Sequence, residues 1–440
     1  MIFIRNCLCF PSCFIIETNQ LQRKNRMKTV GIVVEYNPLH NGHTYHFMEA
    51  KRQTASEAVV AVMSGHFLQR GEPAIVNKWA RAKMALHMGV DLVLEIPFIY
   101  ATQNAEQFAF GSIATLHATG IVDEVCFGSE SGDIAWIEKL AAILAEEPSA
   151  FQETLLKGLA QGRSYPAAYG EAIQALLPSL ATDTLQGHVT EPNNILGLNY
   201  CLALHRLQSP MRPATIKRQK AGYHQETVTD QSIASATALR KLILEHANNG
   251  IHAIRPYVPQ STFEILQAEE AAGRFPLTWE RFYPYLQHQL LTRWPEELAT
   301  IHEMNEGIEH RILQALPRST SFYHLMETVK TKRYTWARLQ RLFLYSMLNL
   351  TRSKIAVINA KQGPAYIRVL GFNRTGKRLL KRMKETSTLP VITRVAKDKH
   401  PMLTLDVQAG ALYALGLSES LRQKEMQREY WQTPLHFDHI

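Results

Sequence analysis

Short apolar runs alternate with longer amphipathic stretches through the first third of the chain. The apolar runs predict four buried strands, at Thr29–Glu35, Ala58–Ser64, Asp91–Ile96 and Asp123–Phe127. The stretches between them repeat apolar residues at helical spacing and predict helices over Gly42–Gln53, Lys78–Met88 and Asn104–Ala118. Strands that alternate with helices in this way are typical of βαβ units, so we predict an α/β fold with a parallel sheet.

Helical patterns dominate the rest of the chain. After the fourth strand the pattern predicts a helical stretch over Ile134–Leu180, a helix start at Pro192–Asn194, an extended segment Pro213–Arg218 and a helix opened by Ser235–Thr237. Beyond Pro256 the strand signals fade, and long amphipathic helices are predicted over Trp279–Trp294, Ile301–Leu316 and Trp336–Leu350. We therefore place a boundary near residue 250, between a first domain of residues 27–250 and a mainly helical, basic second domain of residues 251–440.

Positive charge is concentrated in one part of the chain. The net charge of the 440 residues is +9, but residues 330–399 alone hold 18 Lys and Arg against only Glu385 and Asp398. A basic tract on an otherwise mildly acidic chain indicates a polyanionic partner, with nucleic acid the leading candidate.

The composition, 46% hydrophobic and 20% charged, is that of a globular protein. No apolar run approaches the roughly 20 residues of a membrane-spanning helix, so we expect no membrane partner.

The first 26 residues differ from the remainder. They hold three of the five cysteines, Cys7, Cys9 and Cys13, and end in a basic patch before Met27. A secretory signal and a metal or disulfide cluster are two interpretations, but Arg5 interrupts the apolar stretch and the cysteine spacing fits no common zinc pattern. We favour a translated upstream region, or a disordered extension, before a natural start at Met27. The other two cysteines lie in apolar surroundings typical of core thiols, so we expect a reducing, cytoplasmic location.

The most informative motif is HNGH, residues 40–43, which follows the first predicted strand. His40 and His43 are three residues apart at a helix start, so both can face a ligand held at the helix N-terminus. That end offers free N–H groups and partial positive charge, which suit phosphates. Gly42 has no Cβ, so a base or ribose can approach the backbone. Imidazole donors there can stabilise charge that develops on phosphates during adenylyl transfer.

Two other interpretations of the histidine pair remain at this point. Such a pair on a helix can be incidental, or it can bind a metal. Its position after the first strand of a parallel sheet favours a nucleotide, because these folds bind ligands at the carboxyl ends of their strands. A Rossmann glycine fingerprint and a P-loop are both absent, which argues against ordinary dinucleotide or kinase chemistry.

Longer segments carry a family resemblance. The HxGH pattern is that of the nucleotidylyltransferase superfamily, so the first domain is expected to be Rossmann-like. The wider runs VGIVVEYNPLHNGHTYH, VMSGHFLQRGEPAIVNKWARAKMAL, FGSESGD, PNNILGLNY and IASATALR resemble the bacterial tRNA(Met) cytidine acetate ligases. The resemblance covers about Met27 to Arg240 and continues more loosely into the basic half.

The resemblance implies an ATP-dependent ligase. Acetate would be adenylated with release of pyrophosphate, and acetyl would then pass to N4 of the wobble cytidine in elongator tRNA(Met). ATP is therefore the expected co-substrate, Mg²⁺ its counterion held mainly by phosphates and water, and coenzyme A is not used. No covalent nucleophile is required, which fits the absence of a Ser/His/Asp or Cys/His signature.

The resemblance also implies site residues. The ATP-binding loop would comprise Val33, Val34, Glu35, Tyr36, Asn37, Pro38, Leu39, His40, Asn41, Gly42, His43, Thr44, Tyr45 and His46. Further ATP contacts would come from Gly128, Asn194, Arg218, Ser235 and Thr237. Each of these residues also has a purely structural interpretation. Gly128 can form a turn at the end of a strand, and Asn194, Ser235 and Thr237 can cap helices. Arg218 can be a solvated side chain, and Lys217 or Lys220 can bind the phosphate in its place.

A polar loop after the second strand is a candidate for the acetate and cytidine end of the site. It runs from His66 to Pro73 and is followed by Lys78. Lys78 or Arg70 could hold the carboxylate or neutralise pyrophosphate, although loop charges are commonly only solvated. The predicted catalytic set is His40, His43 and Lys78.

The basic half supplies the candidate tRNA surface. Five cations at helical spacing form the predicted backbone-contact set: Arg374, Lys377, Arg378, Lys381 and Arg382. Tyr334, Trp336 or Phe372 could stack on a splayed base, although core packing is the alternative for each.

Two other functions remain open from the sequence. One is a nucleotidyltransferase that adenylylates a small phosphorylated metabolite, and the other is a non-catalytic RNA-binding protein that senses ATP. The basic tract argues against the first, and the set of phosphate-binding segments argues against the second.

Overall fold

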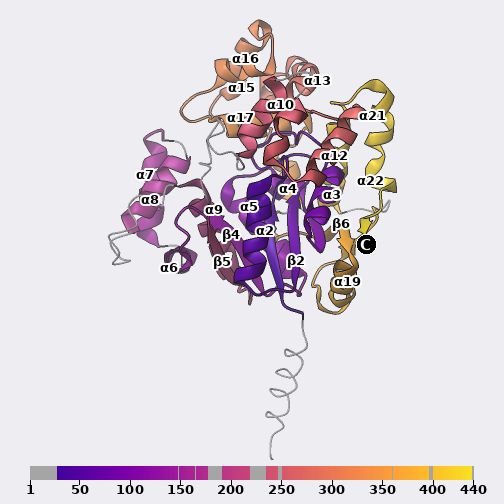
Figure 1. Ribbon diagram of the computed structural model, residues 1–440. Coiled ribbons are helices and arrows are strands. Elements are labelled where there is room, and N and C mark those ends of the chain that lie inside the picture. The colour runs from indigo at the N-terminus through magenta and orange to yellow at the C-terminus, as the bar shows by residue number, and fades with distance from the viewer. Residues whose placement is uncertain are drawn as a thin grey trace, which may run out of the picture.

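Five parallel strands form the centre of the molecule. The computed structural model describes residues 27–146, 148–163, 165–176, 191–218, 234–245, 250–358, 360–395 and 400–438 (Figure 1). The parallel strands are β1 (Thr29–Val34), β2 (Ala58–Ser64), β3 (Leu92–Ile96), β4 (Glu124–Ser129) and β5 (Arg212–Lys217). Their spatial order is β5-β4-β1-β2-β3, and neighbours are paired in parallel. The predicted parallel α/β sheet is confirmed.

Helices cover both faces of this sheet, because alternate residues of each strand point to opposite sides. Val60 and Val62 of β2 belong to one hydrophobic cluster, while Val59 and Ala61 belong to the other. The first face is covered by α5 (Ala105–Ala118), α6 (Ile134–Ala145) and α9 (Pro192–Arg206), and the second by α2 (Asn41–Gln53), α3 (Lys78–Met88), α10 (Ala236–Glu245) and α12 (Gln260–Ala271). Strands buried on both faces are nearly all apolar, which explains why the sequence identified them.

Three strands that the sequence analysis missed come from the second half of the chain. β6 (Ile367–Asn373) pairs antiparallel with β3, and β7 (Val391–Ile392) and β8 (Leu435–Phe437) pair with β6. The expectation that strands end before residue 256 is therefore wrong. β7 and β8 are too short to give a periodic pattern, and β6 carries the charged Arg368 in its interior.

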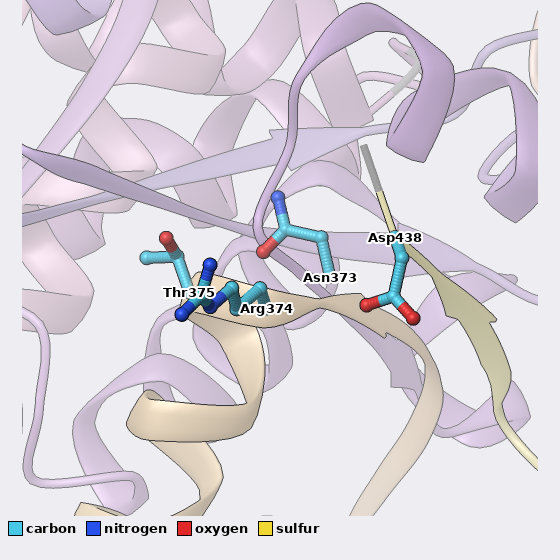
Figure 2. A pocket seen from close by; sticks show the side chains of 4 residues that line it. All are labelled: Asn373, Arg374, Thr375 and Asp438. Atoms are coloured by element: carbon cyan, nitrogen blue, oxygen red, sulfur yellow. The ribbon is translucent and has the colours of Figure 1, made fainter. Parts of the chain in front are cut away.

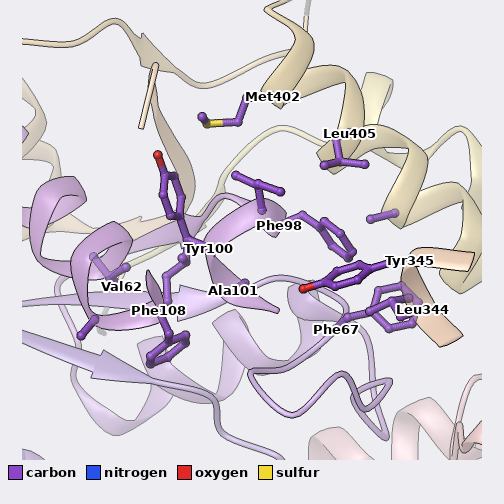
Figure 3. Close-up of a cluster of buried hydrophobic side chains, with 14 of the residues drawn as sticks. Val62, Phe67, Phe98, Tyr100, Ala101, Phe108, Leu344, Tyr345, Met402 and Leu405 are labelled. Atoms are coloured by element: carbon purple, nitrogen blue, oxygen red, sulfur yellow. The ribbon is translucent and has the colours of Figure 1, made fainter. Parts of the chain in front are cut away.

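The two halves also share a hydrophobic core. Figure 3 shows Phe67, Phe98 and Tyr100 packed near Tyr345 and Met402, which come from the second half. The hydroxyl of Tyr345 donates to the carbonyl of Thr102. The predicted boundary near residue 250 is thus crossed by both the sheet and the core.

Most helices agree with their predicted positions. The predicted stretch Ile134–Leu180 is divided into α6, α7 (Ser149–Ala160) and α8 (Tyr165–Leu176), and its last residues lie outside the described ones. The helix predicted at Ile301 begins later, as α15 (Ile308–Ala315). In the described part of the chain, the remaining helices of eight or more residues are α13 (Trp279–Leu291), α16 (Phe322–Val329), α17 (Trp336–Met347), α19 (Arg374–Thr386), α20 (Pro401–Ala414) and α21 (Glu419–Met426). The shorter helices are α4 (Phe98–Ala101), α11 (Gly250–Ala253), α14 (Pro295–Leu298), α18 (Arg352–Ile358) and α22 (Arg428–Trp431).

Residues 1–26, which the sequence analysis interpreted as an extension, lie outside the described residues. Among the described residues, no helix is both long enough and apolar enough to cross a membrane. Cys126 and Cys201 are buried free thiols, as expected for core cysteines.

Candidate active site

The loop between β1 and α2 places the histidine motif at the carboxyl edge of the parallel strands. After Val34 the chain turns through Tyr36, whose φ of 52° lies in the left-handed region. The buried Tyr36 ring meets the His43 ring edge-on, with 5.0 Å between the centroids. His40 has an extended backbone (φ −137°, ψ 172°) and caps α2. Both histidines therefore lie at the N-terminus of α2.

This position coincides with a switch point of the sheet. β1 and β4 are neighbours, but α2 after β1 and α6 after β4 cover opposite faces. Open α/β sheets bind ligands in the crevice that such a divergence creates.

Backbone N–H groups orient the two imidazoles. Nδ1 of His40 accepts a hydrogen bond from the Gly42 N–H (3.1 Å), and Nδ1 of His43 accepts one from the His40 N–H (3.3 Å). Because an N–H can only donate, each neutral ring must carry its proton on Nε2. The ring centroids of His40 and His43 are 3.8 Å apart. The site therefore presents two neighbouring Nε2–H donors.

The imidazoles are neutral at physiological pH. Burial, together with the positive charges of Arg218 and Arg240, lowers the pKa of His40 to about 3. Burial lowers the pKa of His43 well below its ordinary range, with His40 and Arg218 adding to the effect. Burial and Arg218 lower the pKa of His46 to about 4. The formal positive charge at the site therefore comes from the arginines and not from the histidines.

Arg218 and Arg240 approach the motif from two other elements. Arg218 follows β5, is exposed, and donates to Oδ1 of Asn193 at 3.3 Å. Arg240 of α10 donates to the carbonyl of Asn37 at 3.1 Å and pairs with Glu72 at 3.2 Å. Arg218 is among the ATP contacts predicted from the sequence and Arg240 is not, although Arg240 ends the segment IASATALR.

Gly128 and Asn194 shape the wall on the β4 side. A Cβ at Gly128 would lie 3.3 Å from Cγ of Arg218, so glycine leaves room for that arginine. Asn194 is fully buried, and its Oδ1 accepts hydrogen bonds from the N–H groups of Glu130 (2.9 Å) and Ser131 (3.2 Å). Asn194 thus fixes the loop after β4, and direct contact with a nucleotide stays a prediction for both residues.

The hydroxyl groups at the start of α10 have local partners. Oγ of Ser235 accepts a hydrogen bond from the Ala238 N–H at 3.0 Å, which confirms that Ser235 caps the helix. Oγ1 of Thr237 accepts one from Arg240 at 3.4 Å. Phosphate contacts by Ser235 and Thr237 stay predictions.

Part of the predicted ATP loop belongs to the core. Val34, Tyr36 and Leu39 are buried in the cluster under α2 and α3, so they shape the loop. The Glu35 carboxylate accepts hydrogen bonds from Ser64 and from the Gln69 N–H, and burial raises its pKa.

Other groups of the same loop have no internal partner. Buried polar atoms without a hydrogen bond among the described residues include Nδ2 of Asn37, Oγ1 of Thr44 and Nε2 of His46. Buried polar atoms are normally paired, so a ligand at this end of α2 would find available partners.

The polar loop after β2 is rigidly held. The buried Arg81 donates to the carbonyls of Glu35 (2.7 Å) and Ser64 (3.1 Å), which joins the ends of β1 and β2. Arg70 lies partly exposed in the turn that follows, where the Gly71 N–H donates to the Leu68 carbonyl at 2.8 Å. A role for Arg70 in binding acetate or pyrophosphate stays a prediction.

Lys78 lies in a buried ion-pair network. Its Nζ is 2.7 Å and 2.8 Å from the two carboxylate oxygens of Glu95 and 2.9 Å from Glu429. Glu429 also pairs with Arg368 at 3.2 Å. All four side chains are buried. These contacts tie α3 and β3 to β6 and α22, and they do not support the catalytic role predicted for Lys78.

The predicted tRNA-binding cations lie on α19, at the opposite edge of the sheet. β6 runs antiparallel to β3, so it ends where β3 begins, and α19 starts there. Arg374, Lys377, Arg378 and Lys381 are exposed, while Arg382 is partly buried and donates to the Met27 carbonyl at 3.2 Å. The predicted stacking residue Tyr334 is buried, as its core-packing alternative requires.

A polar hollow of about 470 Å³ lies at the start of α19, lined by Asn373, Arg374, Thr375 and Asp438 (Figure 2). It is at the amino edge of the parallel strands and is therefore not part of the candidate active site.

Among the described residues, no group of three or more His, Cys, Asp or Glu side chains is arranged to hold a metal ion.

Comparison with known proteins identifies the class and then the family. A model of the HIGH Nucleotidyl Transferase family matches residues 27–429, so the chain belongs to this class. The tRNA(Met) cytidine acetate ligase of Halalkalibacterium halodurans is 41% identical, over 94% of this chain and 98% of the relative. That of Bacillus subtilis is 38% identical, with the same coverage. Within the class, the chain belongs to the tRNA(Met) cytidine acetate ligase family.

Similar solved structures support the assignment of the chain to this family. The apo crystal structure of Thermotoga maritima TmcAL (form I) has a TM-score of 0.87 and 35% identity, covering 94% of this chain and all of that one. A second Thermotoga structure, bound with alpha-thio ATP (form II), has a TM-score of 0.85 at the same identity and coverage. The Rossmann-like nucleotidyltransferase fold and the family predicted from sequence are confirmed. Neither alternative function is favoured.

Proposed function

We propose that this chain activates acetate with ATP and transfers the acetyl group to the wobble cytidine of elongator tRNA(Met). The observation that carries the proposal is the pair of Nε2–H donors of His40 and His43 at the N-terminus of α2. Relatives at about 40% identity bear the name of this activity, and one similar structure binds an ATP analogue.

The first step is adenylation. A carboxylate oxygen of acetate attacks the α-phosphorus of ATP, the bond to the β-phosphate bridging oxygen breaks, and pyrophosphate leaves with its electron pair. Negative charge on the phosphates grows as that bond breaks. The two Nε2–H donors and the α2 N-terminus are held in place before the reaction, so they can stabilise this charge without rearranging, and the side chains of Arg218 and Arg240 add positive charge nearby.

The second step is acyl transfer. The exocyclic amine of cytidine attacks the acetyl carbonyl, the bond from the acetyl carbon to the phosphate oxygen breaks, AMP leaves as the phosphate anion, and one amine proton passes to water. The mixed anhydride is the acyl donor, so the scheme needs neither coenzyme A nor a covalent enzyme intermediate.

Mg²⁺ fits this scheme as a companion of ATP. Since the described residues offer no cluster of three ligands, the ion would be held mainly by phosphate oxygens and water. Its contribution would be to neutralise the leaving pyrophosphate. A tRNA substrate also implies a cytoplasmic location.

Acetate-dependent exchange between labelled pyrophosphate and ATP, in the absence of RNA, tests the adenylation step. We expect exchange with acetate and none without it. If exchange is absent under both conditions, the chain does not form acetyl-adenylate on its own and the proposal is wrong in that step. Exchange that needs a phosphorylated metabolite in place of acetate would favour a metabolite nucleotidyltransferase.

A further inference from the structure

Helix α19 lies along the amino edge of the parallel strands. At its start, the Asn373 N–H donates to the Asp91 carbonyl at 3.0 Å, and a Cβ at Gly376 would collide with that same carbonyl oxygen. Further along, Arg382 donates to the Met27 carbonyl just before β1, and the hydroxyl of Thr386 donates to the Thr119 carbonyl at 2.9 Å. The helix therefore spans the sheet from β3 to the loop before β4, and Figure 1 shows it at the end of the sheet away from α10.

The outer face of α19 is strongly basic. Its inner side buries Gly376, Leu379 and Met383. The exposed cations are Arg374, Lys377, Arg378, Lys381 and Lys384, and Glu385 is the single acidic residue of the helix. Among the described residues, none of these five cations forms an ion pair with a carboxylate. An array of like charges that are not paired with carboxylates is unfavourable for an isolated protein, and it suits a polyanion.

The basic face is far from the candidate active site. The histidine motif follows the carboxyl end of β1, whereas α19 lies at the amino ends of the same strands. β2 has seven residues, and each residue of a strand adds about 3.3 Å to its length. The amino and carboxyl edges of the sheet are therefore roughly 20 Å apart. A base held beside His40 and His43 therefore cannot be reached by the α19 side chains.

We infer that α19 binds the sugar–phosphate backbone of the tRNA outside its anticodon loop, as an anchor remote from the cytidine that reacts. The inference rests on the proposed function, because it assumes that the wobble base enters the site at α2. Lysine and arginine along one helix face contact successive phosphates without reading sequence. Duplex RNA presents a regular array of phosphates for such contacts.

The chemistry of the face favours RNA over a protein or a membrane. None of the large hydrophobic side chains that are exposed among the described residues lies on α19. A membrane-surface helix needs an exposed apolar side for insertion, and stable protein interfaces need an apolar centre. In α19 the apolar side is already packed against the sheet.

The test compares two triple variants of the full chain. Lys377→Glu, Arg378→Glu and Lys381→Glu together reverse three charges, and Lys377→Arg, Arg378→Lys and Lys381→Arg together preserve them. We expect the charge reversal to weaken binding of elongator tRNA(Met) at least tenfold and to reduce the salt dependence of binding. The charge-preserving control should bind like the unaltered chain, and acetate-dependent exchange without RNA should be unchanged in both.

Hydroxyl-radical footprinting of the bound tRNA locates the contacts. We expect the charge reversal to lose protection at riboses outside the anticodon loop while protection within the loop persists. Loss confined to the loop would overturn the remote anchor, as would unchanged affinity in the charge-reversed variant. If the unaltered chain protects no part of the tRNA, the proposed function itself fails in its RNA step, which separates that failure from failure of the anchor.

Discussion

Nδ1 of His40 and Nδ1 of His43 each accept a hydrogen bond from one backbone N–H group, so Nε2 is the nitrogen of each ring that can face a ligand. Burial and the positive charges of Arg218 and Arg240 lower the pKa of His40, and burial, His40 and Arg218 lower that of His43. Both rings therefore act as neutral hydrogen-bond donors and not as cations.

His43→Ala removes one Nε2–H donor and should reduce acetate-dependent pyrophosphate exchange by roughly 100-fold or more. Binding of tRNA should be largely retained, because α19 and the rest of the surface are untouched. Met48→Ala, an exposed position on the same helix, serves as the control and should exchange normally. Full activity in the His43→Ala variant would contradict the role assigned to this imidazole.

The charge state of the motif can be observed directly. A lowered pKa means that the neutral form persists below the ordinary histidine value of 6.5, so His40 should remain neutral on acidification to pH 5. NMR of the chain labelled with ¹⁵N-histidine should show the His40 and His43 rings as Nε2–H tautomers over pH 5–8. Titration of either ring near pH 6.5 would show that the site is more hydrated than its burial indicates.

At the scale of elements, the sequence was most successful where local pattern decides the structure. β2 and α3 have the predicted bounds, because a continuous apolar run and a helix between Asn77 and Gly89 are local signals. β6 was missed because its buried Arg368 is neutralised by Glu429, which is 61 residues away in sequence. The partners of Lys78 in this network could not be predicted either, because a lysine in a buried ion pair and a catalytic lysine give the same signal in a sequence.

Lys78→Met should destabilise the fold by about 3–5 kcal/mol, because Glu95 and Glu429 would lose the cation that lies between them. Urea unfolding followed by circular dichroism measures the effect. Lys83→Met, an exposed position on the same helix, should change stability by no more than about 0.5 kcal/mol. A stable Lys78→Met protein that has lost acetate-dependent exchange would instead support the catalytic role.

In the whole molecule, the sequence predicts a domain boundary near residue 250, but the sheet and the hydrophobic core both extend across that position. Charge and helical pattern distinguish the second half, but pairing across a sheet is a long-range property that composition does not encode. β3 pairs with β6, and the buried cluster in Figure 3 draws on both halves. The division at residue 250 therefore marks a change in composition within a shared sheet and core.

A fragment of residues 27–250 should not fold cooperatively. It lacks β6, which covers the edge of β3, and it lacks the carboxylate of Glu429 that pairs with Lys78. Thermal denaturation followed by circular dichroism should show a sharp transition for residues 27–440 and none for the fragment. A cooperative transition in the fragment would establish residues 27–250 as an independent domain.

In the proposed function, one site forms acetyl-adenylate and passes its acetyl group to a specific tRNA. To test both steps together, the purified chain is incubated with ATP, labelled acetate and total tRNA, and the label is followed into purified tRNA species and their nucleosides. We predict label in elongator tRNA(Met), recovered as acetylated cytidine from the wobble position, and dependent on ATP. Acetyl-adenylate without labelled tRNA would contradict the proposed acceptor, and the absence of both products would contradict the role proposed for His40 and His43.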